Sequence, residues 1–299
     1  MNLVTHNGTF HADDVTAYAV LHALFPNAPL VRTRDPELIR SGGIVFDVGM
    51  EHAPERFRFD HHMKDGPKRA DGQPYSSVGL IWKQFGMQYL RQISNVSDAF
   101  VDRVWNEVDS TFIREIDLVD NGVGKPDGSG YAALVDDFNP RWDGSDDEDG
   151  AFLSASFLAR EILDRRVRKA LANALAMKLA TDAAEAAEDP RVVELPYHMP
   201  WEDAIFEGGF DEALYVVYER GGTWYCTAVP PERGSFDRRK SLPNEWGGLR
   251  GGELETVSGV KGAVFCHPAL FICGADSREG IMEMAKKAVA YDEHPTLRA

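Results

Sequence analysis

The sequence lacks an excess of positive charge. Its 32 Lys and Arg residues stand against 48 Asp and Glu residues, which gives a formal net charge of -16 at pH 7. This balance argues against broad, non-specific adhesion to nucleic acid or to an anionic membrane, because such binding depends on a surplus of basic side chains. A phosphate substrate is compatible with the acidity, since divalent cations can supply positive charge locally. The composition therefore favours a metal site.

Cysteines and long apolar runs are also scarce. The three cysteines form no Cys-x-x-Cys pair and lie in apolar, strand-like segments, so Cys226, Cys266 and Cys273 are expected to be buried, reduced thiols. Reduced thiols suit a reducing compartment. No stretch approaches the roughly 18 apolar residues of a membrane span, and the N-terminus has no basic and apolar leader. The expected location is the cytoplasm, without a membrane partner.

The length and the pattern of the first half predict an α/β fold. With 299 residues the chain is longer than a typical single domain, and we expect two domains that share a cleft. Strand-like and helix-like segments alternate in the first half, which predicts a mainly parallel sheet in a domain spanning 1–150. The predicted strands are 2–5, 30–34 and 44–48, and the predicted helices are 13–24, 36–40, 76–85 and 97–119.

The second half has a different texture. Residues 151–189 are rich in Ala, carry apolar side chains at helical spacing, and predict a helical connector. Residues 190–299 are expected to form a smaller α+β domain that closes with a helix at 277–291. Its predicted strands are 214–219, 223–229, 263–267 and 270–273, with a Gly221-Gly222 turn joining the first two.

Residue types that bind metals end four predicted elements of the first domain. Open α/β sheets place their ligand sites at the carboxyl ends of strands, so these side chains are expected to converge. Taken singly, each has an ordinary explanation, such as a helix cap or an exposed carboxylate. Together they would crowd carboxylates that repel one another unless cations neutralise them. The four places hold His6, His11, Asp13 and Asp14; Asp47; Asp60, His61 and His62; and Asp117 and Asp120.

The types of ligand restrict the metal and the chemistry. Carboxylate and imidazole without thiolate suit manganese, magnesium or another divalent ion of similar hardness better than a structural zinc. Mixed Asp and His ligation with a shared carboxylate is what a two-metal site needs, with the ions about 3.5–4 Å apart. The reaction class that follows is hydrolysis of a phosphoester or a phosphoanhydride.

Asp60-His61-His62, preceded by an aspartate on a strand and followed by one at a helix end, resembles the signature of the DHH phosphoesterase superfamily. The closer resemblance is to one branch, the metal-dependent hydrolases related to the melanocyte proliferating gene product. It implies a DHH-type catalytic domain followed by a substrate-engaging domain. The matching blocks run through nearly the whole chain, at 5–14, 32–36, 46–49, 59–62, 76–81, 116–122, 234–243 and 257–267.

The resemblance also implies roles for the clustered residues. Asp47 would bridge two metal ions, with His11 and Asp13 on one and His61 and Asp117 on the other, and His62 would contact the scissile phosphate. The superfamily commonly has Asp-x-Asp where this chain has His-x-Asp, so the ligands within 6–14 stay open, as does the choice between Asp117 and Asp120. The predicted metal ligands are His6, His11, Asp13, Asp47, His61 and Asp117, and the predicted catalytic residues are Asp14, His62 and Asp120.

The second domain carries the predicted substrate contacts. Basic and aromatic residues are interleaved between Arg233 and Arg250, a composition that can stack a base and hold a phosphate backbone. A surface loop packed by its own aromatic residues is the alternative. A strand that ends at a Gly turn before a helix can also hold phosphate at the helix N-terminus. The expected substrate contacts are Arg238, Lys240, His267, Gly274 and Arg278.

These observations predict a phosphoesterase that depends on two divalent metal ions, Mn²⁺ first and Mg²⁺ second. The resemblance includes a eukaryotic relative described as a 3′-5′ RNA exonuclease, which implies single-stranded RNA or short oligonucleotides as the substrate. Two alternatives stay open: a phosphatase or pyrophosphatase that acts on a small metabolite, and a non-catalytic metal-binding interaction protein. A homodimer is also left open.

Overall fold

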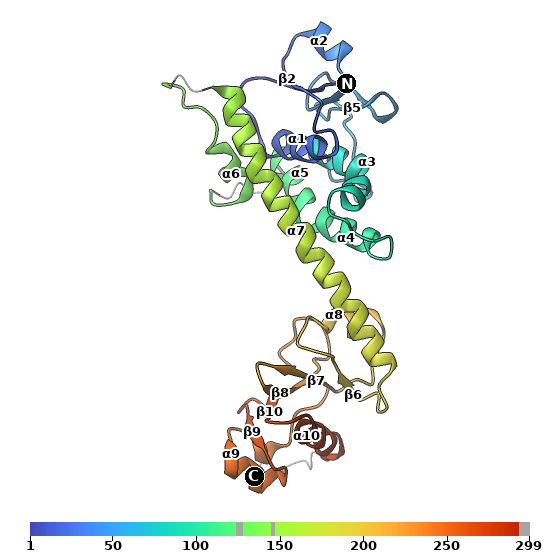
Figure 1. Ribbon diagram of the computed structural model, residues 1–299, viewed down its shortest axis with the longest axis vertical. Helices are drawn as coiled ribbons and strands as arrows, with labels where there is room; N and C mark the ends of the chain where they lie inside the picture. The colour runs from blue at the N-terminus through green and yellow to red at the C-terminus, as the bar shows by residue number, and fades with distance from the viewer. Residues whose placement is uncertain (124–127, 145–146, 293–299) are drawn as a thin grey trace. The chain divides into compact units, whose positions relative to one another are not determined.

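The computed structural model describes residues 1–123, 128–144 and 147–292 (Figure 1). The chain divides into two compact units, Met1–Ala174 (unit 1) and Leu175–Ala299 (unit 2). The boundary falls inside the long helix α7 (Glu148–Glu185), whose first part packs in a core of unit 1 and whose last turns pack in a core of unit 2. The helix predicted as a connector therefore contributes to both cores. None of the helices in the described ranges combines the length and the apolar character that a bilayer span requires.

Unit 1 is built on a five-stranded sheet with the order β2-β1-β3-β5-β4. Its strands are β1 (Leu3–Thr5), β2 (Leu30–Arg32), β3 (Ile44–Phe46), β4 (His52–Ala53) and β5 (Arg58–Phe59). Pairing is parallel except between β4 and β5, which are antiparallel. The predicted α/β class and the parallel pairing of the first three strands are confirmed. The last two strands were not predicted, because two residues are too few to show an alternating pattern.

Alternate residues of the strands face two different cores, as the period of two in a strand requires. Leu3 and Phe46 face the main core, which contains α1 (Ala12–Leu24) and α3 (Ser77–Gln92). Val4 and Val45 face a smaller core on the other side of the sheet, against α2 (Pro36–Ser41). Because β1 and β3 pair in parallel, their carboxyl ends meet at one edge of the sheet.

The helix predicted at 97–119 is divided into three parts. α4 (Val101–Val108) continues into the π-helical turn η2 (Asp109–Ile113) and then into α5 (Arg114–Asp120). A π-turn is rare and often lies near a functional site, and the spacing of apolar residues does not reveal it. Two short elements complete unit 1, the 3₁₀ turn η1 (Pro54–Arg56) and helix α6 (Tyr131–Asp136).

Unit 2 contains a second five-stranded sheet, with the order β6-β7-β8-β10-β9. Its strands are β6 (Val192–Glu194), β7 (Tyr215–Arg220), β8 (Thr223–Ala228), β9 (Ala263–Cys266) and β10 (Ile272–Ala275). β6 and β7 are parallel and the other pairs are antiparallel. Gly221 and Gly222 both have positive φ, 63° and 84°, as the tight hairpin turn between β7 and β8 requires.

Helices cover both faces of this sheet. Tyr215 and Val217 face the core that holds α10 (Arg278–Ala290) and α9 (Gly251–Ser258). Val216 and Tyr218 face the core that holds α8 (Glu202–Glu207) and the end of α7. The 3₁₀ turn η3 (Asn244–Trp246) packs on the first of these cores. All three cysteines are buried and free, as the sequence predicts.

Candidate metal centre

The connection from β1 to α1 brings acidic and imidazole groups into the interior. His6 follows β1 and is buried, with 4% of its surface exposed. Gly8 has φ 85°, a conformation that side chains rarely adopt, and this lets the chain turn towards α1. The backbone N–H of His11 donates to Asp14 Oδ1 at 2.8 Å. Asp13 and Asp14 are therefore held, fully buried, in the first helical turn.

Asp47 joins two histidines at the end of β3. Its φ of 55° is uncommon for a residue with a side chain. Its Oδ2 lies 3.1 Å from His6 Nε2, and its Oδ1 lies 3.2 Å from His61 Nε2. Ser77 Oγ donates to the same Oδ1 at 2.9 Å. Burial alone would raise the pKa of Asp47, but its close contacts with the two histidines outweigh burial and lower it.

Asp60 organises the loop that follows β5. Its Oδ1 accepts from the backbone N–H of His61 at 2.7 Å and lies 2.8 Å from His62 Nδ1, while its Oδ2 accepts from Met50 N–H at 2.6 Å. The hydrogen bond with Asp60 raises the pKa of His62 to about 9, and 53% of the His62 side chain is exposed. Because Nδ1 is bound to Asp60, Nε2 is the ring atom left for a substrate.

The two carboxylates at the end of α5 have different surroundings. Arg69 Nη2 donates to Asp117 Oδ2 at 2.6 Å, and Ser76 Oγ donates to Asp117 Oδ1 at 2.8 Å. Both oxygens of Asp117 are thus hydrogen-bonded within unit 1. Asp120 Oδ2 instead lies 3.3 Å from His61 Nε2, at the cluster itself. The structure thus brings Asp120 into the cluster and holds Asp117 beside it.

Three groups of side chains present ligand atoms that lie within 4.8 Å of one another. Asp47 belongs to two of these groups, and His61 Nε2 connects with the third through contacts of 3.8 Å to Asp13 and 3.3 Å to Asp120. The groups are His6, Asp14 and Asp47; Asp47, His61 and His62; and His11, Asp13 and Asp120. The arrangement therefore offers adjacent ligand positions around one shared carboxylate.

The donor set of this cluster fits divalent cations. Asp13 Oδ1 and Asp14 Oδ2 are buried without a hydrogen-bond partner, and the close contacts of His61 Nε2 with carboxylates lack hydrogen-bond alignment. Buried polar atoms without partners are costly. Burial, followed by the charge of Asp47, raises the pKa of Asp13 well above its usual value and that of Asp14 to about 7. A cation would supply both the missing partner and the opposite charge.

A cavity of about 350 Å³ opens onto this cluster. Its lining includes the buried His6 and Asp47 and the exposed His62, and Arg34 contributes a basic group to its wall. The remaining lining residues are His11, Val48, Gly49, Met50 and Asp60. His62 and Arg34 therefore place an imidazole and a guanidinium on the wall of the cavity that reaches the cluster.

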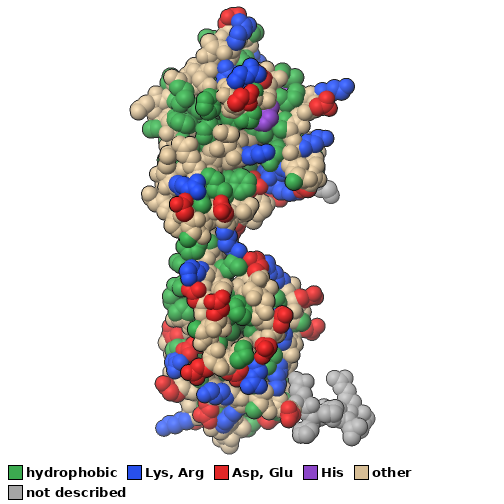
Figure 2. All heavy atoms as spheres, turned by 90° about the vertical axis from the view of Figure 1, so that its right-hand side faces the viewer, with side chains coloured by type: hydrophobic (Ala, Val, Ile, Leu, Met, Phe, Trp, Pro, Cys, Tyr) green, Lys and Arg blue, Asp and Glu red, His purple; other side chains and the backbone are tan. Residues whose placement is uncertain are grey.

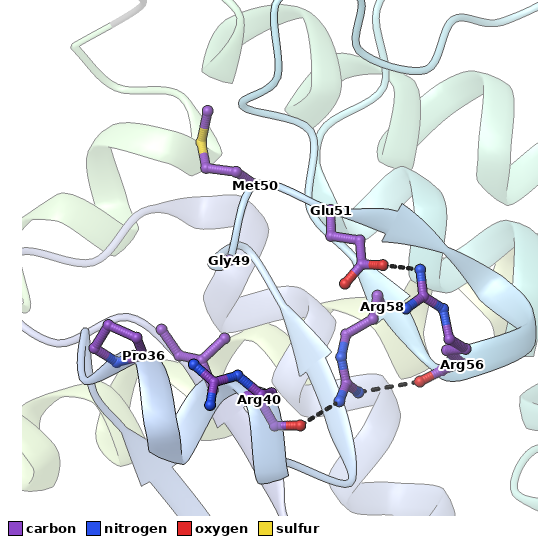
Figure 3. Close-up of a pocket in the computed structure, with 8 residues that line it drawn as sticks. Pro36, Arg40, Gly49, Met50, Glu51, Arg56 and Arg58 are labelled. Atoms are coloured by element: carbon purple, nitrogen blue, oxygen red, sulfur yellow. Dashed lines mark hydrogen bonds and ion pairs between the residues drawn. The ribbon is translucent and has the colours of Figure 1, made fainter.

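A neighbouring cavity of about 460 Å³ shares Gly49 and Met50 with the first and is lined by three arginines (Figure 3). These arginines already have partners. Arg56 forms an ion pair with Glu51, and Arg58 donates to the backbone oxygens of Arg40 and Arg56 at 3.0 Å each. Their first role is therefore to hold the loops beside the metal centre.

Residues that the sequence did not single out position the ligands. Ser77 N–H donates to Asp13 Oδ2 at 3.2 Å, so Ser77 contacts two of the clustered carboxylates. Arg69 also binds Asp109 of the π-turn, at 2.5 and 3.0 Å. Ser76 occupies the N-cap position of α3, but its hydroxyl donates to Asp117 rather than to the helix backbone. The motif at 76–81 was the available signal for the serines, whereas nothing in the loop sequence distinguished Arg69.

The predicted substrate contacts of unit 2 lie in ordinary structural positions. Lys240 Nζ donates to the backbone oxygen of Val289 at 2.8 Å, near the end of α10, whereas Arg278 at the start of α10 pairs with Glu194 at 2.5 Å. His267 Nδ1 accepts from Ala269 N–H at 3.0 Å, and Gly274 is buried in β10. Arg238 is half-buried. On the face shown in Figure 2, acidic and basic side chains are interspersed over the lower part of the view.

Comparison with known proteins gives one family. The model named MYG1_exonuc, described as "Uncharacterised protein family (UPF0160)", matches residues 2–289. The MYG1 exonuclease of Rattus norvegicus is 34% identical over 329 residues, covering 97% of this chain and 85% of the relative. The MYG1 exonuclease of Homo sapiens is 35% identical over 324 residues, covering 96% and 85%. RecJ from Thermus thermophilus, solved with Mn²⁺, is 13% identical and covers 97% of this chain and 52% of RecJ, with a TM-score of 0.28, which is too low to assign a fold.

Proposed function

We propose that this chain, which belongs to the MYG1 exonuclease family (UPF0160), is a divalent-metal-dependent phosphodiesterase that removes nucleotides from the 3′ end of single-stranded RNA or short oligonucleotides. The family match confirms the resemblance read from the sequence. The names of the relatives support a hydrolase of the exonuclease or phosphodiesterase type. Unit 1 is the DHH-type catalytic domain, and unit 2 engages the substrate. The three buried thiols suit a reducing compartment such as the cytoplasm.

The observation that carries the proposal is the shared carboxylate of Asp47. His6, Asp14 and Asp47 would hold one ion. Asp13, His61 and Asp120, with His11 beside them, would hold the other, and Asp47 would be shared. These oxygen and nitrogen donors suit Mn²⁺, and Mg²⁺ next. When bound, such a pair of ions activates a water molecule and neutralises phosphoryl charge.

The protein groups around the cluster orient the phosphate. His62 Nε2 donates a hydrogen bond to a phosphoryl oxygen, while Asp60 fixes the orientation of the ring through Nδ1. Arg34 adds positive charge on the wall of the same cavity. Asp117 acts as a positioning residue. It accepts a hydrogen bond from Ser76, and the next residue, Ser77, donates hydrogen bonds to Asp13 and Asp47. Arg238, Lys240, His267, Gly274 and Arg278 stay predictions for substrate contacts.

The Asp47→Asn variant tests the proposal directly. Asn tolerates the left-handed backbone at this position and keeps the shape of the side chain, but it removes the shared negative charge. We expect hydrolysis of 5′-labelled single-stranded RNA in Mn²⁺ to fall by at least about 10²–10³-fold, the loss typical of one transition-state contact. Binding of Mn²⁺ by calorimetry should weaken in parallel. Asp98→Asn, at an exposed ion pair with Arg91, is the matched control.

The same assay separates the alternatives. Shortening of 5′-labelled RNA one nucleotide at a time supports attack from the 3′ end, and release of the labelled nucleotide first contradicts it. Hydrolysis of pyrophosphate alone would indicate the small-molecule phosphatase. Undiminished RNA hydrolysis by Asp47→Asn, or in excess chelator, would overturn the role of the metal centre. Metal binding without hydrolysis of any of these substrates would favour the non-catalytic protein.

A further inference from the structure

A cavity of about 590 Å³ in unit 1 borders the candidate metal centre, and the proposed function assigns no ligand to it. Its volume lies within the range of about 300–1,000 Å³ that small-molecule sites occupy. Its wall includes His11 and Asp120, which also belong to the metal-binding groups. A ligand that fills this cavity therefore lies directly beside the cluster.

The inner wall is apolar and aromatic. The ring centroids of Phe112 and Tyr131 are 5.0 Å apart in an edge-to-face arrangement. Tyr131 and Val119 are half-buried and supply apolar surface to the cavity, while Phe10 and Ile116 are buried in the core behind it. Such walls suit a flat, unsaturated ring, because base and aromatic side chain stack through their faces irrespective of sequence.

This wall is held in place by hydrogen bonds behind it. Tyr131 Oη lies 2.7 Å from Thr16 Oγ1, which itself donates to a carbonyl of α1. Asn139 binds the backbone of Phe10 twice, accepting from its N–H at 3.0 Å and donating to its carbonyl at 2.9 Å. A site with fixed walls loses little entropy when it binds a ligand.

Three charged side chains also line the cavity. The Arg166 guanidinium lies 5.4 Å from the centre of the Phe112 ring, and the carboxylates of Glu115 and Asp136 also line the cavity. All three side chains belong to exposed residues. The cavity thus combines an apolar interior with hydrogen-bonding groups, which matches the faces and the edge of a nucleobase.

We propose that this cavity receives the base of the nucleotide that is cleaved from the substrate. The inference rests on the proposed function and specifies how that site selects its substrate. The base enters beside Phe112 and Tyr131, and its phosphate reaches the cluster past His11, which lines both this cavity and the cavity that contains His62. A base must leave its stack and its pair to enter such a cavity, so a single-stranded end is the preferred substrate. Recognition by stacking also suits an acidic chain, which has little surplus charge for a phosphate backbone.

Equilibrium binding tests the cavity independently of catalysis. Calorimetry on the Mn²⁺-loaded full chain compares adenosine 5′-monophosphate with ribose 5-phosphate, which carries the same phosphate without a base. We expect the nucleotide to bind at least about tenfold more tightly, the effect of one stacked base. Equal binding of the two ligands, or no measurable binding of the nucleotide, overturns the proposal.

Two filling variants locate the effect within the cavity. Ala133→Trp fills it from α6, and Thr111→Phe fills it from the π-turn on the facing wall. Leu134→Trp is the matched control, because Leu134 is the next residue of α6, is 46% exposed and does not line the cavity. The preference for the nucleotide should be lost in a filling variant that keeps the wild-type circular dichroism spectrum and still binds ribose 5-phosphate. If a folded filling variant keeps the preference for the nucleotide, or if the control variant loses it to the same extent, the base binds elsewhere.

Hydrolysis then distinguishes failure of this inference from failure of the proposed function. Two RNA oligonucleotides are compared, one intact and one whose 3′-terminal nucleotide lacks its base. A kcat/KM at least about tenfold lower for the abasic end supports the cavity as the base site. Equal rates overturn the cavity while leaving the exonuclease intact. If neither RNA is hydrolysed but the nucleotide preference is present in the binding assay, the cavity stands and the proposed function fails.

Discussion

Unit 1 and unit 2 each fold around a five-stranded sheet, but they bury different side chains. In the described ranges the buried carboxylates all belong to unit 1: Asp13, Asp14, Asp47, Asp60 and Asp117. In unit 2, the buried polar groups in those ranges are uncharged, such as the hydroxyls of Ser258 and Tyr215. Burial of charge is costly unless the charge is paired or coordinates a metal. Both units have apolar cores, but only unit 1 also accepts the cost of burying a cluster of carboxylates in its described part.

The largest expected effects come from two carboxylates on α5, Asp117 and Asp120. Asp120→Asn removes a group that lies at the cluster, and Asp117→Asn removes one that binds Arg69 and Ser76 beside it. We expect Asp117→Asn to lower kcat about 10–100-fold, the usual effect of a support residue, and Asp120→Asn to lower it further. Mn²⁺ affinity should fall more for Asp120→Asn. The reverse order in both measurements would identify Asp117 as the ligand.

Arginines from the two units provide the next test. Arg69 is 8% exposed and neutralises Asp109 and Asp117, so Arg69→Leu leaves a buried carboxylate without its partner. We expect a loss of about 3–5 kcal/mol in the free energy of unfolding. Arg278→Leu breaks the pair with Glu194 at the surface, and its unfolding midpoint in urea should stay close to that of the wild type. Similar losses for both variants would remove the distinction between the units.

The buried carboxyls of unit 1 should also make the stability of the metal-free protein depend on pH. Burial and the charge of Asp47 raise the pKa of Asp13 and Asp14, the latter to about 7. Burial lowers the pKa of His6, but its interactions with Asp47 and Asp14 raise it overall. Raised pKa values mean that the folded, metal-free protein binds protons more tightly than the unfolded chain, so its stability falls as pH rises. For the carboxyls, this loss begins above about pH 4 and continues through about pH 7.

The expected result is therefore a thermal shift that grows with pH. In the presence of chelator, the Tm should fall as the pH is raised from 5.5 to 8. Added Mn²⁺ should raise the Tm more at pH 8 than at pH 5.5. The Asp47 pKa is lowered, which gives the opposite slope, but it acts only in acid. A metal-induced shift that is the same at both pH values would show that the buried carboxyls do not govern the stability of the metal-free form.

The success of the sequence analysis also differs between features. The strands that end at Thr5 and Phe46 were predicted well, because continuous apolar runs bounded by turn residues identify them. The convergence of His6, Asp47 and His61 followed from the rule that ligands gather at the carboxyl ends of strands. These features depend on local pattern and on the topology of the parallel sheet.

Other features depend on contacts that no local pattern encodes. Asp117 and Asp120 are three residues apart on one helix, and what distinguishes them is Arg69, a residue 48 positions earlier in the sequence. The π-turn at 109–113 places Asp109 beside the same arginine. A pattern of apolar spacing reports which face of a helix is buried, but not which carboxylate an arginine from a distant loop will neutralise.

The cysteines give the smallest predicted effect and test unit 2 alone. Cys226, Cys266 and Cys273 are buried within its core, and burial raises the pKa of Cys266 to about 12. Because the thiolate is the reactive form, iodoacetamide at pH 8 should modify almost none of the three in the native protein and all three in urea. Chelation should leave this protection unchanged, since the candidate metal ligands lie in unit 1. Rapid labelling after chelation would instead show that the loss of metal from unit 1 also opens the core of unit 2.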